Sequence, residues 1–227
     1  MVEKMINFLK LVPLFSSLKD EELDTILNHS SKVNYPKNKI IFLENEEGNE
    51  LYIILKGSVK VVRISESGEE IILAVLQKGD FFGEMSLLDG KPRSATVISN
   101  EDSTLILFNK NNFEKVIEKY PRIALKLLKE ITLRLRKADD LIGNLAFLNV
   151  SGRIAGILLQ LAEEHGQKTK EGVIIKSRPT HQSIANMVSA SRETVTRILK
   201  RFEEKQYIRM SGKDITIFDQ ENIKNIL

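Results

Sequence analysis

The chain has 227 residues, 42% of them hydrophobic, which is enough to bury a core in each of two domains. It contains no cysteine, so disulfides, thiolate metal sites, iron–sulfur clusters and cysteine nucleophiles are excluded. The net charge of +3 is unevenly spread, because nine basic and only three acidic side chains lie between Lys176 and Lys213. This basic segment favours a polyanionic partner such as nucleic acid, and a solvated charged helix face is the alternative interpretation.

The sequence offers little for an enzyme or a membrane protein. Its histidines, His29, His165 and His181, lack the paired spacing of a metal site, and no Walker loop or nucleophile elbow is present. We therefore expect no catalytic residue and no metal. The first residues lack the order of a signal peptide, and no apolar run is long enough to cross a bilayer. A cytoplasmic protein without membrane contact is the expectation.

The first third of the chain changes from helical to strand patterning. To about Ser31 the apolar residues recur at helical spacing, as at Leu23, Ile26 and Leu27. From Val33 onward, short β-rich runs are separated by glycine-containing turns. The predicted strands are 40–42, 51–55, 59–62, 71–76, 95–98 and 105–108. Many short strands at near-even spacing predict a small sandwich or barrel.

A long helix is predicted from about Asn112 to Phe147. Within it, apolar residues alternate at spacings of four and three, which is the heptad pattern of a coiled coil. They are Ala124, Leu128, Ile131, Leu135, Ala138, Ile142 and Leu145. The pattern predicts a seam along which two copies of the chain pair, although one amphipathic helix packed on its own domain shows a similar stripe.

A helix-turn-helix is predicted near the C-terminus. Thr180 and Ser191 are good N-caps for two short helices, with a turn at Ser189 between them. The outward side chains of the second helix are Arg192, Glu193, Thr196, Arg197 and Lys200. A recognition helix presents such side chains to base edges in the major groove, where arginine pairs with guanine and glutamate accepts from cytosine. Segments 207–210 and 215–218 predict a β-hairpin wing, with Lys213 at its tip to meet a phosphate. A plain helical hairpin with solvated charges is the alternative.

Three motifs in order resemble the Crp/Fnr family, the cyclic-AMP receptor protein family of bacterial transcription regulators. Residues 191–200, Ser-Arg-Glu-Thr-Val-Thr-Arg-Ile-Leu-Lys, resemble its recognition helix, and residues 143–155 resemble its hinge. Residues 83–88, Gly-Glu-Met-Ser-Leu-Leu, with 92–96, Pro-Arg-Ser-Ala-Thr, resemble its phosphate-binding cassette. The resemblance spans nearly the whole chain and implies an α+β fold. Its parts are a cyclic-nucleotide-binding β-roll with an N-terminal helix (1–111), a long dimerisation helix (112–147) and a winged helix-turn-helix DNA-binding domain (148–227).

The resemblance implies a dimeric, sequence-specific transcription regulator. Arg192, Glu193 and Arg197 match the family's base-reading positions, which implies inverted TGTGA-like half-sites on double-stranded DNA. RNA polymerase is the further partner that the family implies. One departure is Ser189, where the family often has a glycine, so the geometry of this turn is expected to differ slightly.

The cassette has the chemistry of an anion site. Gly83 permits close backbone approach, a short helix beginning near Glu84 points free amides at an anion, and Arg93 can fork onto a phosphate. By the resemblance, Glu84 takes a ribose hydroxyl, and Arg93 and Ser94 take the phosphate of a cyclic nucleotide. The expected effector-binding residues are Gly83, Glu84, Met85, Arg93, Ser94, Ala138 and Asp139.

The identity of the effector is left open by the long helix. Ala138 and Asp139 align with a threonine–serine pair whose hydroxyls reach adenine in the cyclic-AMP receptor. Cyclic AMP or another cyclic nucleotide is expected as the effector, with cyclic di-GMP or no effector as alternatives, and no further cofactor is required. A nucleotide-binding regulatory subunit of an enzyme is the alternative from another class, since it shares the cassette but not the winged helix. Target genes, and activation as opposed to repression, are not readable from the sequence.

Overall fold

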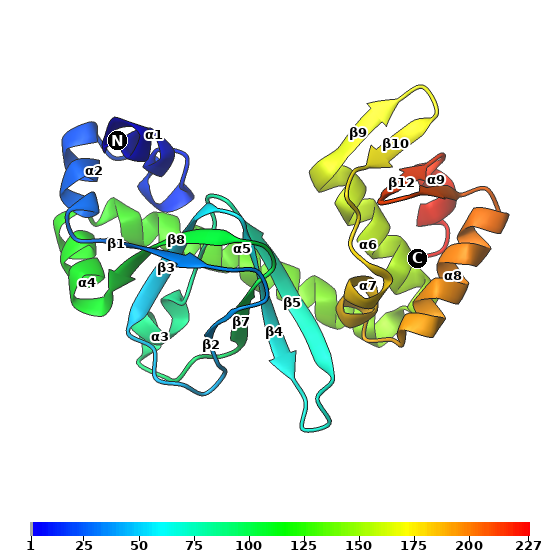
Figure 1. Cartoon of the computed structure of the whole chain (residues 1–227), viewed down its shortest axis with the longest axis horizontal. Helices are drawn as coiled ribbons and strands as arrows, with labels where there is room; N and C mark the ends of the chain where they lie inside the picture. Colours follow the sequence, from blue (N-terminus) through cyan, green and yellow to red (C-terminus); the bar gives the residue numbers. More distant parts are fainter. Residues whose placement is uncertain (1) are drawn as a thin grey trace. The chain divides into compact units, whose positions relative to one another are not determined.

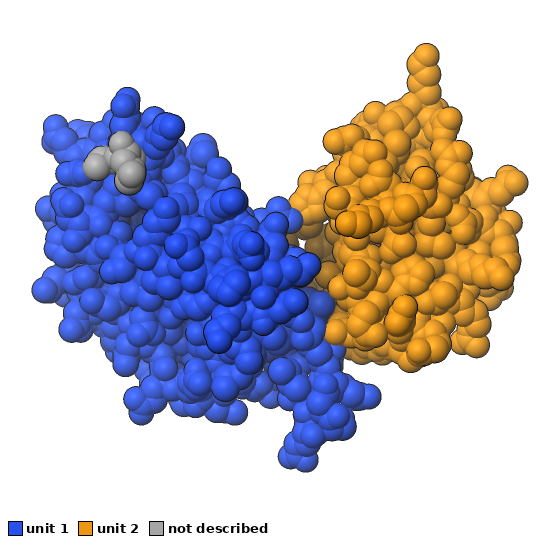
Figure 2. Space-filling model, in the orientation of Figure 1, with its two compact units in different colours: residues 1–135 blue, residues 136–227 orange. Residues whose placement is uncertain are grey.

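The computed structural model of the protein describes residues 2–227. They form two compact units that divide between Leu135 and Arg136 (Figure 2). This division falls inside the long helix α5 (Arg122–Phe147), so one helix contributes to both units. Among the described residues, no helix is long and apolar enough to cross a membrane, and no group of side chains is suited to hold a metal ion.

The first unit begins with the predicted helical segment. It contains α1 (Val2–Leu9), a short 3-10 turn η1 (Pro13–Phe15) and α2 (Asp20–Leu27). The Glu22 carboxylate accepts a 2.7 Å hydrogen bond from the backbone of Lys19 and so closes the first turn of α2. Leu23 and Ile26 are buried on the inner side of this helix, as its spacing predicts.

Eight short strands follow and form a β-roll of two antiparallel sheets (Figure 1). The strands are β1 (Ser31–Tyr35), β2 (Ile40–Phe42), β3 (Glu50–Lys56), β4 (Ser58–Ile64), β5 (Glu70–Gln77), β6 (Phe81–Phe82), β7 (Thr96–Ser99) and β8 (Ser103–Asn109). One sheet has the order β1-β8-β3-β6 and the other β2-β7-β4-β5. The sequence predicts six of these strands. It does not predict β1 or β6, because β6 has only two residues and β1 lacks an apolar run.

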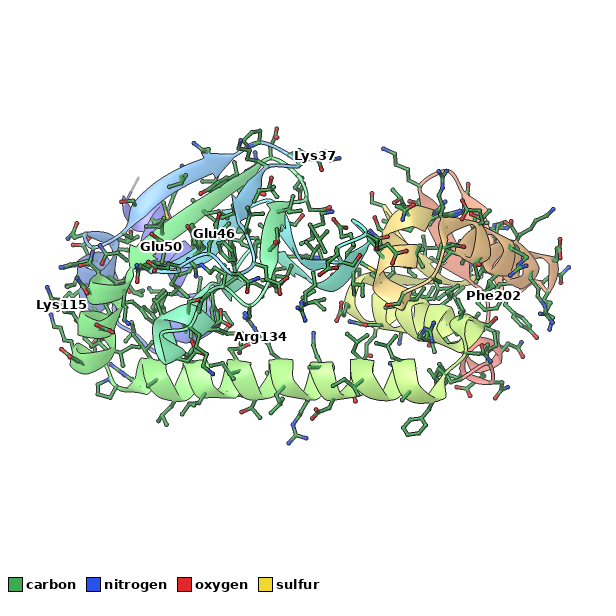
Figure 3. All side chains as sticks on the ribbon, turned by 90° about the horizontal axis from the view of Figure 1, so that it is seen from below. Lys37, Glu46, Glu50, Lys115, Arg134 and Phe202 are labelled. Carbon is green, nitrogen blue, oxygen red and sulfur yellow. The ribbon has the colours of Figure 1, made fainter. Side chains whose placement is uncertain are left out.

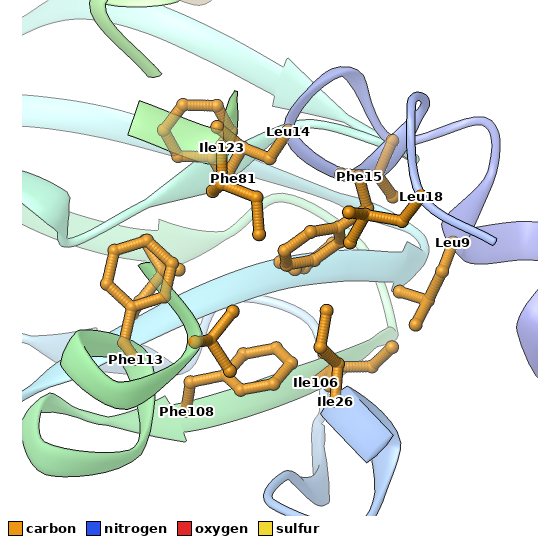
Figure 4. Packing of buried hydrophobic residues seen from close by; sticks show 14 of the residues in the cluster. Leu9, Leu14, Phe15, Leu18, Ile26, Phe81, Ile106, Phe108, Phe113 and Ile123 are labelled. Atoms are coloured by element: carbon orange, nitrogen blue, oxygen red, sulfur yellow. The ribbon is translucent and has the colours of Figure 1, made fainter. Parts of the chain in front are cut away.

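The core of the first unit lies between the β-roll and the helices around it (Figure 4). The rings of Phe15 and Phe108 lie 6.0 Å apart and join the N-terminal turn to β8. Phe113 and Ile123 add the helices that follow the roll to the same cluster. Because these side chains are almost completely buried, they hold the roll and the beginning of the long helix as one body.

The prediction of a single helix over 112–147 is wrong in one respect, because the structure has two helices there. They are α4 (Lys110–Lys119) and α5 (Arg122–Phe147). Pro121 disfavours helical geometry at the residue before it, and Tyr120 accordingly has φ −130° and ψ 72°. The long helix therefore begins ten residues later than predicted and spans about 39 Å.

The second unit is a helical domain with a small sheet (Figure 1). Its elements are the C-terminal part of α5, α6 (Val150–His165), β9 (Gly166–Thr169), β10 (Gly172–Ile175), α7 (His181–Val188), α8 (Arg192–Glu204), β11 (Ile208–Ser211), β12 (Asp214–Ile217) and α9 (Gln220–Lys224). The strands have the order β11-β12-β10-β9. The polar residues between Gly166 and Gly172 predict a loop, and this prediction is wrong because residues 166–169 form β9. Strand β9 has no apolar pattern of its own and forms by pairing with β10.

Candidate effector pocket and DNA-binding surface

Arg93 lies at the centre of the predicted effector pocket and is 3% exposed. Its Nη1 donates to the carbonyl oxygens of Glu50 (3.0 Å) and Gly83 (2.9 Å). Gly83 has φ +85°, and a Cβ there would lie 2.7 Å from the Glu50 carbonyl oxygen and 2.8 Å from Arg93 Nη1. Glycine at this position therefore allows the backbone to approach and orient the guanidinium.

The remaining edge of the Arg93 guanidinium is suited to an anion. Nη2 donates to Glu50 Oε2 at 3.0 Å, and Nε is buried with no hydrogen-bond partner among the described residues. Because Nη1 is held by two carbonyls, the Nε–Nη2 fork is the part of the side chain left for a bidentate anion. Burial lowers the pKa of Arg93, while Tyr52 and Glu50 act in the opposite direction.

Aromatic rings surround this guanidinium. Its central carbon lies 4.1 Å from the centroid of the Phe42 ring, and Tyr52 stacks on Phe82 with centroids 5.0 Å apart. Burial raises the pKa of Tyr52 well above its usual value, so its phenol stays neutral. Sequence reasoning missed these rings and Glu50, since in the sequence they are ordinary residues of short strands.

Glu84 is 4% exposed, and it is paired with a residue that sequence reasoning missed. Arg134 of α5 donates from Nη1 to Glu84 Oε1 at 2.9 Å and from Nη2 to the carbonyl oxygen of Phe81 at 2.6 Å. Figure 3 shows Arg134 extending from α5 toward the β-roll. The pair joins residues 50 positions apart in the chain, and no local pattern in the sequence indicates it.

The structure brings Gly83, Glu84 and Arg93 together, with two more of the predicted residues at the exposed edge of the same group. Ser94 Oγ lies 3.4 Å from Met85 Sδ, and both side chains are accessible. Ala138 and Asp139 are exposed on the part of α5 that belongs to the second unit. Their place relative to the cassette therefore stays a prediction.

The predicted seam on α5 is only partly covered by the chain itself. Leu128, Leu135 and Ile142 are 60%, 61% and 65% exposed, and Leu145 and Ala138 are also exposed. Ala124 and Ile131 are half-buried, and Ile131 packs against the core of the first unit. One turn of the stripe thus packs into the core of the chain itself, as expected for an amphipathic helix packed on its own domain. The larger apolar side chains of the stripe remain exposed to water.

The predicted helix-turn-helix is formed by α7 and α8. Thr180 Oγ1 accepts from the backbone of Ser183 (3.0 Å), and Ser191 Oγ accepts from that of Thr194 (3.2 Å), so both predicted N-caps are confirmed. In α8 the buried side chains are Val195, Ile198, Leu199 and Phe202. The opposite side holds a shallow depression lined by Arg192, Glu193, Thr196, Arg197 and Lys200. The arrangement leaves a charged helix face free for base edges.

The turn between α7 and α8 explains the departure at Ser189. This residue has φ +49° and ψ +59°, the left-handed conformation that glycine adopts at the lowest cost. Serine adopts this conformation at some cost in backbone energy. The expected slight difference from the family's turn stays a prediction.

A second depression lies between the start of α7 and the wing. It is lined by Arg178, Thr180, His181, Gln182, Arg192, Gly212 and Lys213. Lys213 stands in the turn between β11 and β12, as predicted, and its carbonyl oxygen accepts from the backbone of Arg178 at 2.8 Å. An ion pair between Lys176 and Asp214 (2.7 Å) holds the same loop to the wing. Sequence reasoning missed Arg178 and His181 as members of this group.

Comparison with known proteins identifies both parts of the chain. A model of the cyclic nucleotide-binding domain matches residues 32–120, and a model of the Crp-like helix-turn-helix domain matches residues 152–226. The cAMP-activated global transcriptional regulator CRP of Salmonella typhimurium is 38% identical over 201 residues, which covers 88% of this chain and 95% of that protein. The CRP-like cAMP-activated global transcriptional regulator of Mycobacterium tuberculosis is 31% identical over 219 residues, covering 96% and 98%.

A solved structure supports the same fold. A CooA mutant from Carboxydothermus hydrogenoformans superposes with a TM-score of 0.81 at 23% identity, covering 95% of this chain and 94% of that one. Together, the two domains define a DNA-binding transcription regulator with a cyclic nucleotide-binding domain. The chain belongs to the Crp/Fnr family.

Proposed function

We propose that the protein is a homodimeric regulator whose affinity for DNA is set by a cyclic nucleotide in the β-roll, with cyclic AMP as the nucleotide. The observation that carries this proposal is the buried guanidinium of Arg93, whose Nε has no hydrogen-bond partner among the described residues and whose Nη2 bonds to the Glu50 carboxylate. This edge is suited to a phosphate, because a bidentate anion supplies a hydrogen-bond acceptor to Nε and can replace the carboxylate at Nη2. The two relatives named above are both described as cAMP-activated.

Within the pocket, each residue has a chemical role in this proposal. Arg93 and Ser94 bind the cyclic phosphate, and Glu84 accepts from the ribose hydroxyl after exchanging its contact with Arg134. Gly83 orients Arg93, and Met85 lies over the edge of the pocket. Ala138 and Asp139 face the base, where the Asp139 carboxylate accepts from an exocyclic amino group in place of a hydroxyl. In this proposal residues 1–111 bind the effector, 112–147 dimerise and 148–227 bind DNA.

The DNA-reading part of the proposal rests on the exposed face of α8. Arg192, Glu193 and Arg197 read base edges of inverted TGTGA-like half-sites about 34 Å apart, one helical turn of DNA. The flanking contacts to the phosphate backbone come from Thr180, Lys200 and Lys213, and the Thr196 methyl group contacts the bases beside the reading side chains. RNA polymerase is the protein partner that a regulator of this kind contacts at a promoter.

The test is the binding of a fluorescently labelled duplex with inverted TGTGA half-sites, at fixed salt, with and without cyclic AMP. Cyclic AMP is expected to tighten binding of the unaltered protein at least tenfold, which corresponds to about 1.4 kcal/mol. Arg93→Lys keeps the charge but removes the fork, so the response to cyclic AMP is expected to disappear. Arg63→Lys alters an exposed arginine of β4 and serves as the matched control.

Two outcomes separate the parts of this proposal. Tight binding of the duplex without any response to cyclic AMP leaves the DNA reader in place and rejects cyclic AMP as the effector. No preference for the TGTGA duplex over a random duplex of equal length rejects the proposed half-site.

A further inference from the structure

The depression between α7 and the wing has a charge pattern that the base-reading residues do not explain. Arg178, Arg192 and Lys213 contribute three cations to its lining, and no acidic side chain lines it among the described residues. Two buried nitrogens in the same group have no hydrogen-bond partner: Arg178 Nε and His181 Nε2. Buried donors and acceptors are normally satisfied, so unpaired nitrogens in a cationic depression point to an anionic ligand that is absent from the chain itself.

The tautomer of His181 follows from its neighbours. Its Nδ1 lies 2.9 Å from Thr196 Oγ1, and that hydroxyl donates its single proton to the carbonyl oxygen of Arg192 (2.9 Å). The hydroxyl oxygen is therefore left to accept, and His181 Nδ1 carries the proton of the neutral ring. Nε2 then holds a lone pair, and His181 is one of the residues that line the depression. In this state it repels the oxygen of an anion, and only a proton on Nε2 turns it into a donor.

We propose that Arg178, His181 and Lys213 form a binding site for one phosphodiester group of the DNA backbone, and that His181 contributes to it only after Nε2 takes up a proton. This inference rests on the proposed DNA-binding function and adds a regulated contact to it. The protonated ring keeps its hydrogen bond to Thr196 through Nδ1, so the contact also ties α7 to the recognition helix α8.

The pH dependence follows from the surroundings of the ring. Burial first, and then the cations Arg178 and Arg192, hold the pKa of His181 below its usual value in the free protein. Lys213 from the wing adds a further positive charge to the same depression. A bound phosphate introduces negative charge beside the ring and raises this pKa, so binding takes up a proton. DNA affinity is therefore expected to rise as the pH falls through the pKa of the bound state, and to level off below that of the free state.

The experiment measures binding of a labelled duplex by fluorescence anisotropy between pH 8.0 and 5.5 at constant ionic strength. The expected slope approaches about one proton per protomer, or roughly a tenfold gain in affinity per pH unit for each protomer engaged. A phosphate contact carries no sequence information, so a random duplex is expected to show the same slope as the half-site duplex. His181→Gln is expected to remove the slope. His181→Arg, with a permanent cation, is expected to bind at pH 8.0 as tightly as the unaltered protein binds at low pH.

His165→Gln is the matched control, because His165 ends α6 and does not line this depression. An unchanged slope in His181→Gln overturns the proposal. Histidine-ring NMR supplies a second readout, and the chain has only three rings to assign. Titration with inorganic phosphate is expected to raise the pKa of His181 and to leave the ring signals of His165 unshifted. If no duplex binds at any pH, the DNA-binding function fails, and the phosphate titration still decides whether the anion site exists.

Discussion

Glu50 and Arg93 form an ion pair inside the proposed effector pocket. The carboxylate of Glu50 occupies Nη2, which is half of the fork that a phosphate needs. Arg93 cannot turn away to find another anion, because two backbone carbonyls hold Nη1. A phosphate that binds the fork therefore has to displace a carboxylate of like charge, and part of its binding free energy is spent on that exchange.

Replacing Glu50 by glutamine is expected to tighten cyclic AMP binding about three- to tenfold, since a neutral amide competes less well than a carboxylate for the guanidinium. Isothermal titration calorimetry gives the affinity directly. Glu47→Gln removes the same charge from an exposed position that precedes β3, and it is expected to leave the affinity within about twofold. Weaker binding by the Glu50 variant would show that the carboxylate orients Arg93 and does not compete with the ligand.

The sequence was least informative about which side chains contact the predicted site residues. Arg93 and Glu84 were predicted from a motif, but their partners Glu50 and Arg134 come from β3 and α5, far away in the chain. Hydrogen bonds between distant residues have no period or spacing that a sequence can show. The caps at Thr180 and Ser191 were predicted correctly because a cap bonds to a backbone group three residues away.

Among the elements, α5 is the helix whose apolar stripe is left exposed to water. Leu128, Leu135 and Ile142 are well exposed along one line of the helix, and exposed apolar stripes of this kind mark sites of protein association. A second copy of α5 at heptad spacing would cover them, as a coiled-coil seam does. The heptad period predicts the stripe, but it does not show that Pro121 separates α4 from α5 or that Ile131 turns to its own core.

Leu135→Glu is expected to convert the dimer to a monomer at micromolar concentration, because two carboxylates would meet at the centre of the seam. Light scattering after size-exclusion chromatography gives the mass of the species in solution. Leu133→Glu is the matched control, since two residues along a helix are about 200° apart around its axis and Leu133 lies off the stripe. Its circular dichroism and mass are expected to match those of the unaltered protein. A dimeric Leu135 variant would place the interface elsewhere.

At the scale of the whole molecule, we propose that effector binding is coupled to DNA reading through α5, the helix that contributes to both units. We expect a bound nucleotide to shift the paired helices, because Arg134, which pairs with Glu84 in the cassette, belongs to the same helix. Such a shift changes the separation of the two recognition helices and so their fit to successive turns of DNA. The order of the domains and the long helix between them were predictable from the sequence, but the pairing of Arg134 with Glu84 was visible only in the structure.

The separation can be measured because the chain has no cysteine of its own. Glu204→Cys at the end of α8 places one spin label on each protomer. Pulsed electron–electron double resonance measures the distance between the two spin labels. It is expected to show a broad distribution of this distance without cyclic AMP and a shifted, narrower distribution with it. Arg93→Lys in the same background is expected to keep the broad distribution at every nucleotide concentration. Identical distributions with and without nucleotide in the unaltered pocket would reject the coupling.

The boundary between the two units lies inside α5, and this position also restricts which insertions in the gene the protein can tolerate. Each codon inserted between Leu135 and Ile142 adds one residue to a continuous helix, which advances everything beyond it by 1.5 Å and turns it by about 100°. A single insertion therefore moves half of the leucine stripe out of line with the other half. Seven inserted codons come within about 20° of the original phase. We therefore expect changes of length in this part of the gene to occur in steps of whole heptads, and we expect single-residue changes to be tolerated better in the turn between Thr169 and Gly172, which joins β9 to β10.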